Sequence, residues 1–507
     1  MENDLRQDYY QKIQNTKVYD IAIKTPLSPL PNLSERYQQQ ISLKREDLQP
    51  VHSFKLRGAY NKIVQLSDKE KEAGVIAASA GNHAQGVAMS AQKLKINATI
   101  VMPKTTPSIK VDSVKKRGAT VILHGDTYDS ASEFALNMAK EQGLSYIHPY
   151  DDPDVIAGQG TIAMELLEQI DTPIDAIFIA VGGGGLIAGI GTYLKAVNPD
   201  IKIFGVEPDD AAAMTGSLEA GRRIKLDEVG IFADGVAVKQ VGEETFRCAQ
   251  NVIDAMITVS TDEICAAIKD IYDDCRAIAE PAGALGLAGL KKYCENTNLK
   301  DQHLVTLNCG ANINFDRLRH VAERAEIGEK KEAIYAVEIP EAPGSFKQFI
   351  NIIGNRSVTE FNYRYNDKSS AQIFVGIELK EGQKERNEIY HALRQAGYMT
   401  IDLTENEMAK VHTRHMVGGR NHSLSNEWVY RIQFPERPGA LREFLDQLSE
   451  KWNITLFHYR NHGADYGRVL AGFDIQAEDA EALETCLRKL GFKYIEETAN
   501  PAYHLFL

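Results

Sequence analysis

Cysteine is scarce in this chain, with six residues among 507 and no Cys-x-x-Cys pair. The six are scattered, at positions 248, 265, 275, 294, 309 and 486. This pattern argues against a disulfide framework and against a thiolate zinc site. It is typical of a reducing compartment, and we therefore expect a cytoplasmic protein.

Positive charge and long apolar runs are also lacking. The 57 lysines and arginines are outnumbered by 70 aspartates and glutamates, and the net charge of −13 argues against a nucleic-acid partner. The start, Met1-Glu2-Asn3-Asp4-Leu5-Arg6, has no apolar core, so we expect no signal peptide. Residues 176–194 carry no charge, but six of these nineteen are glycine. They predict a buried strand, a glycine turn and a helix start, and no membrane partner is expected.

Short apolar runs separated by helical patterns fill residues 20 to 325. The runs are 75–78, 97–102, 120–123, 176–181, 203–206 and 304–307. Continuous apolar strands between helices predict α/β architecture with doubly wound parallel or mixed sheets, here in two subdomains over residues 1–325. Ligands of such sheets bind at the carboxyl ends of the strands.

An internal repeat follows the charged stretch 321–332, which predicts a connecting helix and a linker at 326–333. Residues 337–349 match 432–444, Phe361-Asn-Tyr-Arg364 matches Phe457-His-Tyr-Arg460, and 373–376 match 469–472. Each copy predicts a strand, a Pro-Gly turn, a helix, two strands, a helix and a strand, the split βαβ plan. We expect two α+β modules, at 334–418 and 428–507, that serve as a sensor; a structural oligomerisation domain is the alternative.

Three loops that bear glycine follow predicted strands. A glycine loop at a helix start can surround an anion with backbone N–H groups, and here it consists of Gly182, Gly183, Gly184 and Gly185, with Leu186. No P-loop lysine and no GxGxxG spacing is present, which argues against a nucleotide or dinucleotide and favours one phosphate monoester. The turn Ser79-Ala80-Gly81-Asn82-His83 can receive a carboxylate, and the Asn82 amide can bond a phenolic oxygen. His83 lacks partners at metal-ligand spacing, which favours a structural histidine at a helix start over a metal ligand or base. Cys309 ends the third strand before Gly310 and is either functional or an inert buried thiol.

Lys55 lies between two large apolar residues, Phe54 and Leu56, with Gly58 and Ala59 one helical turn further on. That face leaves space for a flat ring beside the amine. A lysine partly removed from water has a lowered pKa and can attack an aldehyde, although a lone lysine is usually a surface residue.

Four motifs together resemble those of the fold-type II pyridoxal-phosphate enzymes. They are Ser-Phe-Lys-x-Arg-Gly, Ser-Ala-Gly-Asn-His-Ala-Gln-Gly, the four-glycine loop and Gly-Ala-Asn-Ile-Asn-Phe-Asp-Arg-Leu-Arg. The chain is similar over nearly its whole length to biosynthetic threonine deaminases (threonine ammonia-lyases), including their tandem C-terminal ACT-like modules. The resemblance implies deamination of L-threonine to 2-oxobutanoate and ammonia with pyridoxal 5′-phosphate, the first step of isoleucine biosynthesis. It also implies feedback inhibition by isoleucine, antagonism by valine, and a homotetramer.

The resemblance also assigns roles to the motif residues. Lys55 would hold the cofactor as a Schiff base and then remove the substrate α-proton, Asn82 would bond the pyridoxal 3′-oxygen, and the glycine loop with Leu186 would bind the phosphate. The Ser79–His83 turn would hold the substrate carboxylate. Cys309 stands where the family usually has a serine facing the pyridine nitrogen; a neutral partner there favours β-elimination over transamination or racemisation. Tyr363 and Tyr459 match the effector tyrosines, with core packing as the alternative.

Relatives with a divalent-metal site carry Glu-Pro-x-x-Ala-x-Asp, whereas this chain has Glu207-Pro-Asp-Asp-Ala-Ala-Ala213. Because the last ligand is missing, no divalent metal is expected there, Asp209 and Asp210 are expected in a solvated turn, and a monovalent cation stays open. Two other functions also stay open: a serine-preferring dehydratase or racemase of the same fold, and a non-catalytic amino-acid sensor.

Overall fold

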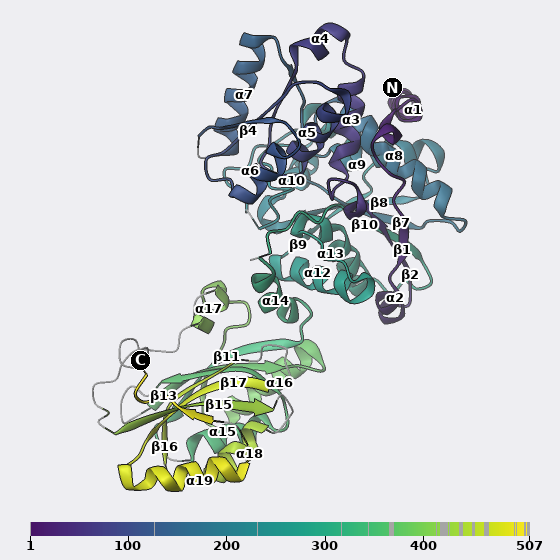
Figure 1. Ribbon diagram of the computed structural model, residues 1–507. Coiled ribbons are helices and arrows are strands. Elements are labelled where there is room, and N and C mark those ends of the chain that lie inside the picture. Colours follow the sequence, from purple (N-terminus) through teal and green to yellow (C-terminus); the bar gives the residue numbers. More distant parts are fainter. Residues whose placement is uncertain are drawn as a thin grey trace. The chain divides into compact units, whose positions relative to one another are not determined.

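The computed structural model divides into two compact units, residues 1–325 and 326–507, which are described separately (Figure 1). It describes residues 2–125, 127–230, 232–315, 317–342, 344–364, 370–411, 413–415, 424, 426–435, 440–448, 452–460, 466–490, 492, 494–500 and 503.

Unit 1 contains two sheets, and this confirms the predicted α/β architecture. The larger sheet is mixed, because β1 alone runs antiparallel to its neighbour. Its order is β1 (Leu27–Pro29), β2 (Gln40–Arg45), β10 (His303–Asn308), β7 (Ala176–Ala180), β8 (Lys202–Pro208) and β9 (Ala255–Val259). The smaller sheet is parallel, in the order β5 (Thr120–Leu123), β4 (Ala98–Met102), β3 (Val75–Ala78) and β6 (Ser145–Tyr146). All six apolar runs form strands; β1, β2, β6 and β9 are additional.

Helices alternate with these strands and shield them from water. Those before β7 are α1 (Glu2–Gln14), η1 (Val18–Asp20), α2 (Pro31–Tyr37), η2 (Glu46–Leu48), α3 (Lys55–Val64), α4 (Asp68–Ala73), α5 (Asn82–Leu94), α6 (Ser108–Lys115), α7 (Tyr128–Gln142) and α8 (Pro153–Gln169). Those after it are α9 (Gly185–Val197), η3 (Asp209–Ala211), α10 (Ala213–Ala220), α11 (Glu243–Ala249), α12 (Thr261–Cys275), α13 (Pro281–Asn296) and α14 (Arg317–Gly328).

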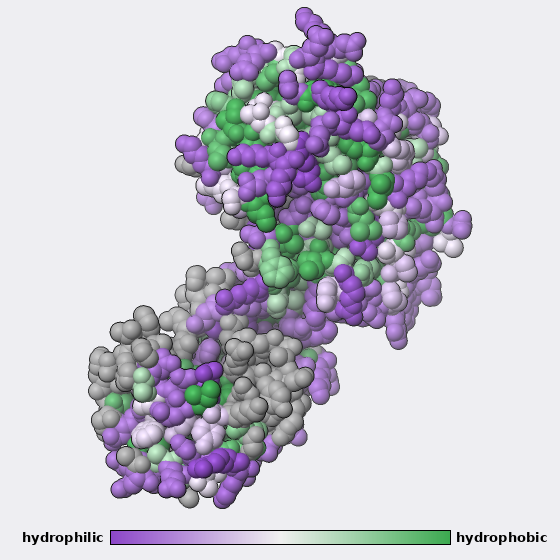
Figure 2. Space-filling model, in the orientation of Figure 1, coloured by the Kyte–Doolittle hydropathy of each residue, from purple (hydrophilic) through white to green (hydrophobic). Residues whose placement is uncertain are grey.

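The charge-free stretch 176–194 folds as the sequence predicts. All five residues of β7 are buried, and α9 is buried from Gly185 through Lys195. Among the described residues, no helix has the length and apolar character needed to cross a bilayer. Hydrophilic residues predominate on the face of unit 1 seen in Figure 2, interrupted by small hydrophobic groups.

The connection between the units differs from the predicted linker and from the predicted helix over 321–332. Helix α14 continues to Gly328, and β11 begins at Glu332, so only residues 329–331 lie outside both elements. Five of the eight residues of the linker predicted at 326–333 therefore lie in regular structure.

In the part of unit 2 that the structure describes, eight strands form one antiparallel sheet, and the helices and strands of both copies follow the predicted order. The prolines of the two predicted Pro-Gly turns, Pro343 and Pro438, lie outside the described residues. The first copy is β11 (Glu332–Pro340), α15 (Ser345–Ile353), β12 (Val358–Arg364), β13 (Ser370–Glu378), α16 (Gly382–Gln395) and β14 (Met399–Asp402). After α17 (Glu407–Val411) and η4 (Thr413–His415), the second copy is β15 (Glu427–Pro435), α18 (Ala440–Leu448), β16 (Asn453–Arg460), β17 (Tyr466–Asp474), η5 (Ala477–Asp479), α19 (Ala480–Leu490) and β18 (Tyr494–Glu496).

The two copies join through their equivalent strands. The sheet order is β14-β11-β13-β12-β16-β17-β15-β18, so β12 pairs directly with β16. Tyr363 lies opposite Phe457, and Tyr459 lies opposite Phe361. The repeated Phe-x-Tyr-Arg motif therefore pairs with itself at the centre of the sheet.

Candidate active site

Backbone hydrogen bonds bring three distant segments together at the carboxyl end of β10. The Phe54 N–H donates to the Cys309 carbonyl at 3.2 Å, and the Ala311 N–H donates to the His52 carbonyl at 3.0 Å. The Glu280 N–H donates to the Gly310 carbonyl at 3.0 Å. The starts of α3 and α13 are thereby fixed beside Cys309, at the sheet edge where α/β folds bind ligands.

Lys55 is the first residue of α3 and is half-buried. Its Nζ lies 5.8 Å from the centre of the Phe54 ring. Burial lowers the pKa of the Lys55 amine, and the nearby Glu280 and Cys309 offset this only in part. A larger share of the amine is therefore neutral than in an ordinary lysine, which is the form that attacks a carbonyl or removes a proton.

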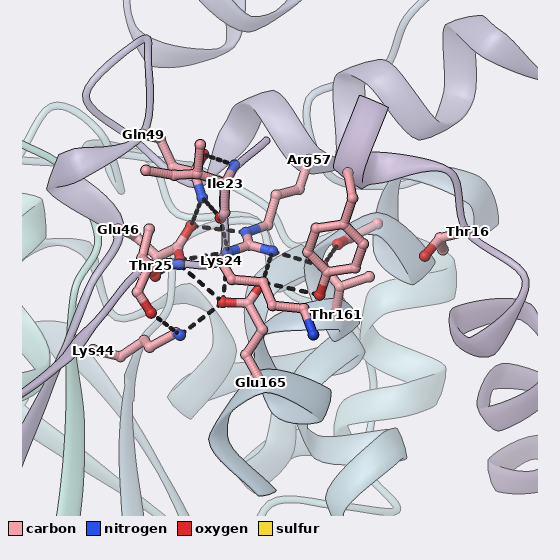
Figure 3. A network of polar contacts seen from close by, with 12 residues as sticks. Thr16, Ile23, Lys24, Thr25, Lys44, Glu46, Gln49, Arg57, Thr161 and Glu165 are labelled. Carbon is pink, nitrogen blue, oxygen red and sulfur yellow. Dashed lines mark hydrogen bonds and ion pairs between the residues drawn. The ribbon is translucent and has the colours of Figure 1, made fainter. Parts of the chain in front are cut away.

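Two residues beyond Lys55, Arg57 anchors the same helix in a buried network of charges (Figure 3). Its guanidinium donates to both Glu46 oxygens at 2.8 and 2.7 Å and to Glu165 at 2.5 Å. Lys44 lies 2.7 Å from the other Glu165 oxygen. The two cations and two carboxylates of this network balance, and together they tie α3 to β2, η2 and α8.

The four-glycine loop joins β7 to α9. Gly184 has φ +94°, which L side chains rarely adopt. A methyl group at Gly183 would lie 2.2 Å from the Tyr150 ring, and one at Gly182 would lie 2.8 Å from Val236 Cα. The N-terminus of α9 has no side-chain cap. Its N–H groups and the positive end of the helix dipole are therefore available to an anion such as a phosphate.

Asn82 begins α5, and its amide already has two partners. Its Nδ2 donates to Glu280 Oε1 at 2.5 Å, and its Oδ1 accepts from Asn312 Nδ2 at 2.7 Å. Burial, assisted by Asp234, raises the pKa of Glu280 to about 7. The sequence analysis missed Glu280; its only signal is a Glu-Pro pair at a helix start.

The turn Ser79–His83 lies beside this group, but only its Asn82 lines the cavity around Lys55. The Gly81 N–H donates to Ser79 Oγ at 3.2 Å, and a methyl group at Gly81 would meet no atom within 4 Å. His83 Nε2 is 2.8 Å from the Ile147 carbonyl, and burial lowers the pKa of this histidine to about 3. A neutral ring bonded to a backbone carbonyl agrees with the structural role predicted for His83.

The cavity around Lys55 unites most of the predicted residues: Lys55, Asn82, Gly182, Gly183, Gly184, Gly185, Leu186 and Cys309. Ser79, Ala80, Gly81 and His83 do not line it. No role in the site was predicted for the other lining residues, which are Phe54, Pro149, Tyr150, Gln159, Ala180, Gly235, Val236, Glu280 and Ala282.

The donor set fits a cofactor that carries an aldehyde and a phosphate. The four-glycine loop, with its uncapped helix start, and Lys55 line the same cavity. Cys309 is 3% exposed, and burial raises the pKa of its thiol, which therefore stays neutral. A ring nitrogen beside Cys309 would meet a thiol and not an anion.

Elsewhere in unit 1, the Glu207 carboxylate is fully buried. It accepts the N–H groups of Met214 and Thr215, both at 2.8 Å, while Asp209 and Asp210 are exposed on η3. Over the part of the chain that the structure describes, no three His, Cys, Asp or Glu side chains are grouped to hold a metal ion.

In unit 2, the candidate effector residues Tyr363 and Tyr459 are both buried. The Tyr363 hydroxyl donates to Glu341 Oε2 at 2.5 Å, and Asn453 Nδ2 donates to the other Glu341 oxygen at 3.0 Å. Glu341 follows β11 and Asn453 begins β16, so this contact joins the two copies of the repeat.

Comparisons with known proteins match both units. Residues 18–310 match the family of pyridoxal-phosphate dependent enzymes, and residues 323–413 and 418–507 each match the C-terminal regulatory domain of threonine dehydratase. A biosynthetic L-threonine dehydratase from Burkholderia multivorans is 53% identical over 99% of both chains. The Escherichia coli enzyme of the same name is 50% identical over 99% of this chain and 97% of its own.

Solved structures agree with these matches. The processed form of threonine deaminase isoform 2 from Solanum lycopersicum is 51% identical over 64% of this chain and 89% of its own, with a TM-score of 0.63. Maize serine racemase is 31% identical over 62% of this chain and 96% of its own, with a TM-score of 0.58. The fold is thus shared with deaminases and racemases alike. The match to the regulatory domain and the higher identity to the deaminase, 51% against 31%, favour the deaminases. The chain belongs to the family of biosynthetic threonine dehydratases.

Proposed function

We propose that this chain deaminates L-threonine to 2-oxobutanoate and ammonia with pyridoxal 5′-phosphate. The observation that carries the proposal is the cavity in which the Lys55 amine, with its lowered pKa, faces a phosphate cradle and the neutral Cys309 thiol. Family membership adds the substrate, because the relatives are named threonine dehydratases.

The residues divide the work by their chemistry. The cofactor phosphate would be held by the α9 N-terminus together with Gly182, Gly183, Gly184, Gly185 and Leu186. Lys55 would hold the aldehyde carbon. The bound cofactor supplies an electron sink for the α-carbon. Lys55, once released, is the general base that removes the α-proton, for which its lowered pKa is suited. In the net step the α-hydrogen and the β-hydroxyl leave as one molecule of water, and hydrolysis of the released enamine then consumes one water and yields 2-oxobutanoate and ammonia.

The remaining residues orient the reactants. Asn82 bonds the pyridoxal 3′-oxygen, and the turn of Ser79, Ala80, Gly81, Asn82 and His83 holds the threonine carboxylate. The open space beside Gly81 supports this assignment, because it admits an anion next to backbone N–H groups at the start of α5. Cys309 would lie beside the ring nitrogen and, as a neutral thiol, would favour β-elimination.

We further propose that isoleucine inhibits the enzyme by binding to unit 2 and that valine antagonises this inhibition. Tyr363 and Tyr459 contact these effectors. Support comes from their equivalent places on paired strands and from the regulatory match over both copies. We also propose a homotetramer in the cytoplasm; the scattered free cysteines fit a reducing compartment.

The test is release of 2-oxobutanoate from L-threonine, with and without isoleucine. Lys55→Ala is expected to lose about 10²–10⁴-fold in kcat, as removal of a general base does, with unchanged thermal unfolding. Lys62→Ala is the matched control, because Lys62 lies on the same helix but pairs with Asp152 at 2.9 Å outside the cavity. A higher kcat/KM for L-serine than for L-threonine would instead identify a serine dehydratase, and absence of both activities would identify a sensor.

A further inference from the structure

A short pairing of two segments of unit 1 holds Asn312 beside Asn82, which lines the cavity. Gly310 forms an antiparallel bridge with Ser53. Asn312 extends this contact with its side chain, because its Nδ2 donates to the Val51 carbonyl at 2.8 Å. The same Nδ2 donates to Asn82 Oδ1 at 2.7 Å. Asn312 therefore uses both hydrogens of its amide nitrogen, one on the backbone and one on Asn82.

These contacts fix which way the Asn82 amide points. A backbone carbonyl only accepts hydrogen bonds, so the Asn312 atom beside the Val51 carbonyl must be the amide nitrogen. The Asn82 atom that receives the second hydrogen of this nitrogen must then be the amide oxygen. The nitrogen of Asn82 lies on the opposite side of its amide, where it donates to Glu280 Oε1 at 2.5 Å. The orientation is thus transmitted from a backbone carbonyl, through two amides, to the cavity.

Glu280 holds the far end of this chain of hydrogen bonds. Its side chain is 5% exposed, and a methyl group at Gly310 would lie only 2.6 Å from Glu280 Oε1, so the close approach depends on that glycine. The Asn82 nitrogen carries two hydrogens, and Glu280 accepts one of them. The second hydrogen remains for an acceptor in the cavity that Asn82 lines.

We propose that Asn312 is a positioning residue that orients the Asn82 amide so that it presents an N–H donor to the pyridoxal 3′-oxygen. This rests on the proposed function, in which Asn82 bonds that oxygen. A donor there favours the ionised form of the 3′-oxygen, because a hydrogen bond to the charged form stabilises it. A reversed Asn82 amide would present its own oxygen instead, and two oxygens repel unless one of them is protonated.

The experiment measures, on the full chain, the Kd of pyridoxal 5′-phosphate and the absorbance spectrum of the holoenzyme. Asn312→Asp replaces the donating nitrogen by an oxygen of the same shape, so the Asn82 amide should turn round. We expect the Kd to rise about tenfold. The protonated share of the 3′-oxygen, read from the ratio of the two absorbance bands of the bound cofactor, should rise as well. Asn312→Ala only frees the Asn82 amide and should show both changes to a smaller extent.

A double variant separates positioning from general damage. If Asn312 acts through Asn82, adding Asn312→Asp to Asn82→Ala should change the Kd by less than about twofold, although each single variant raises it. Additive increases would overturn the proposal. The matched control is Asn61→Asp, because Asn61 also donates to a backbone carbonyl, that of Asp154, at 2.8 Å but does not line the cavity. It should keep the wild-type Kd and spectrum.

The possible failures are distinguishable. A wild-type protein that binds no pyridoxal 5′-phosphate would overturn the proposed function, and this inference with it. A wild-type Kd and spectrum in Asn82→Ala would overturn the bond between Asn82 and the 3′-oxygen, and the role of Asn312 that depends on it, but not the proposed reaction. A wild-type Kd and spectrum in both Asn312 variants, beside an impaired Asn82→Ala, would overturn the positioning role of Asn312 alone.

Discussion

Burial, more than any single neighbour, sets the protonation of the residues around the cavity. It is the largest influence on the pKa of Lys55, which it lowers, and on the pKa of Cys309 and of Glu280, which it raises. Each of these groups is pushed toward its neutral form, as expected in a site with little access to water. The cavity therefore favours the uncharged forms of these proton donors and acceptors more than water does.

This leads to a prediction for Glu280→Gln in the cofactor-free protein. The pKa of Glu280 is raised to about 7 in the folded state, against about 4.3 for an ordinary glutamate. Between these values the folded state binds more protons than the unfolded state, so wild-type stability falls as pH rises from about 4.3 through 7. Glutamine does not titrate. The free energy of unfolding of the variant, relative to that of wild type, should therefore increase between pH 5 and pH 8.

Urea denaturation at four pH values across that range measures this difference. Glu219→Gln, which changes an exposed carboxylate on α10, is the control for a glutamate-to-glutamine substitution outside the cavity. A difference for Glu280→Gln that does not change with pH would mean that Glu280 is ionised throughout the range.

Gly81→Ala separates substrate binding from cofactor binding. A methyl group there meets no protein atom within 4 Å, so the unfolding midpoint should change little. The methyl group would nevertheless occupy the space assigned to the threonine carboxylate. We expect the threonine KM to rise about tenfold, or ~1.4 kcal/mol of binding, with unchanged cofactor affinity by visible absorbance. An unchanged KM would place the carboxylate elsewhere.

Among the elements, β2 explains why part of the fold escaped prediction. The sequence Gln40-Ile-Ser-Leu-Lys-Arg45 alternates apolar and polar residues, which is typical of a half-exposed strand, yet β2 lies within the sheet with Ser42 and Lys44 buried. Lys44 is buried because Glu165, far away in the chain, supplies a counter-charge at 2.7 Å. No local sequence pattern predicts such a partner, whereas continuous apolar strands, such as β3 and β7, can be predicted from their own residues.

The same network makes a prediction about α3. Arg57→Met removes the guanidinium that pairs with Glu46 and Glu165, both fully buried, and leaves the buried Lys44 beside these two carboxylates (Figure 3). Breaking a buried pair in this way costs about 3–5 kcal/mol of unfolding free energy, measurable by urea denaturation. Lys24→Met is the control, since Lys24 and Glu168 are each 53% exposed and solvent screens their pair, so a much smaller loss is expected. Equal losses in the two variants would contradict the anchoring role of Arg57.

At the scale of the whole molecule, the sequence predicted the parts of the site that have a distinctive composition. The glycine loop, the Ser-Ala-Gly-Asn turn and the lysine between apolar residues are unusual, and Lys55, Asn82, Gly182–Gly185 and Cys309 do share one cavity. Glu280, Tyr150 and Val236 are ordinary residues whose importance arises from where the chain brings them. The repeat was likewise visible in the sequence, but the direct pairing of β12 with β16 was not, because register between copies depends on tertiary contacts.

The division into two units allows catalysis and regulation to be separated in one truncated chain. All cavity residues precede Gly328, where α14 ends, and a solved threonine deaminase from T.th., 37% identical, aligns over 98% of its own chain with only 61% of this one. A region of that extent therefore suffices for a folded protein. We expect residues 1–328 to fold and to release 2-oxobutanoate from threonine, with a KM that isoleucine does not change. Retained inhibition by isoleucine would place the effector site in unit 1. A shorter chain that ends at Phe315 should be less stable, because it also loses the Val321 and Ala325 packing and the Arg317 partner of Asp234.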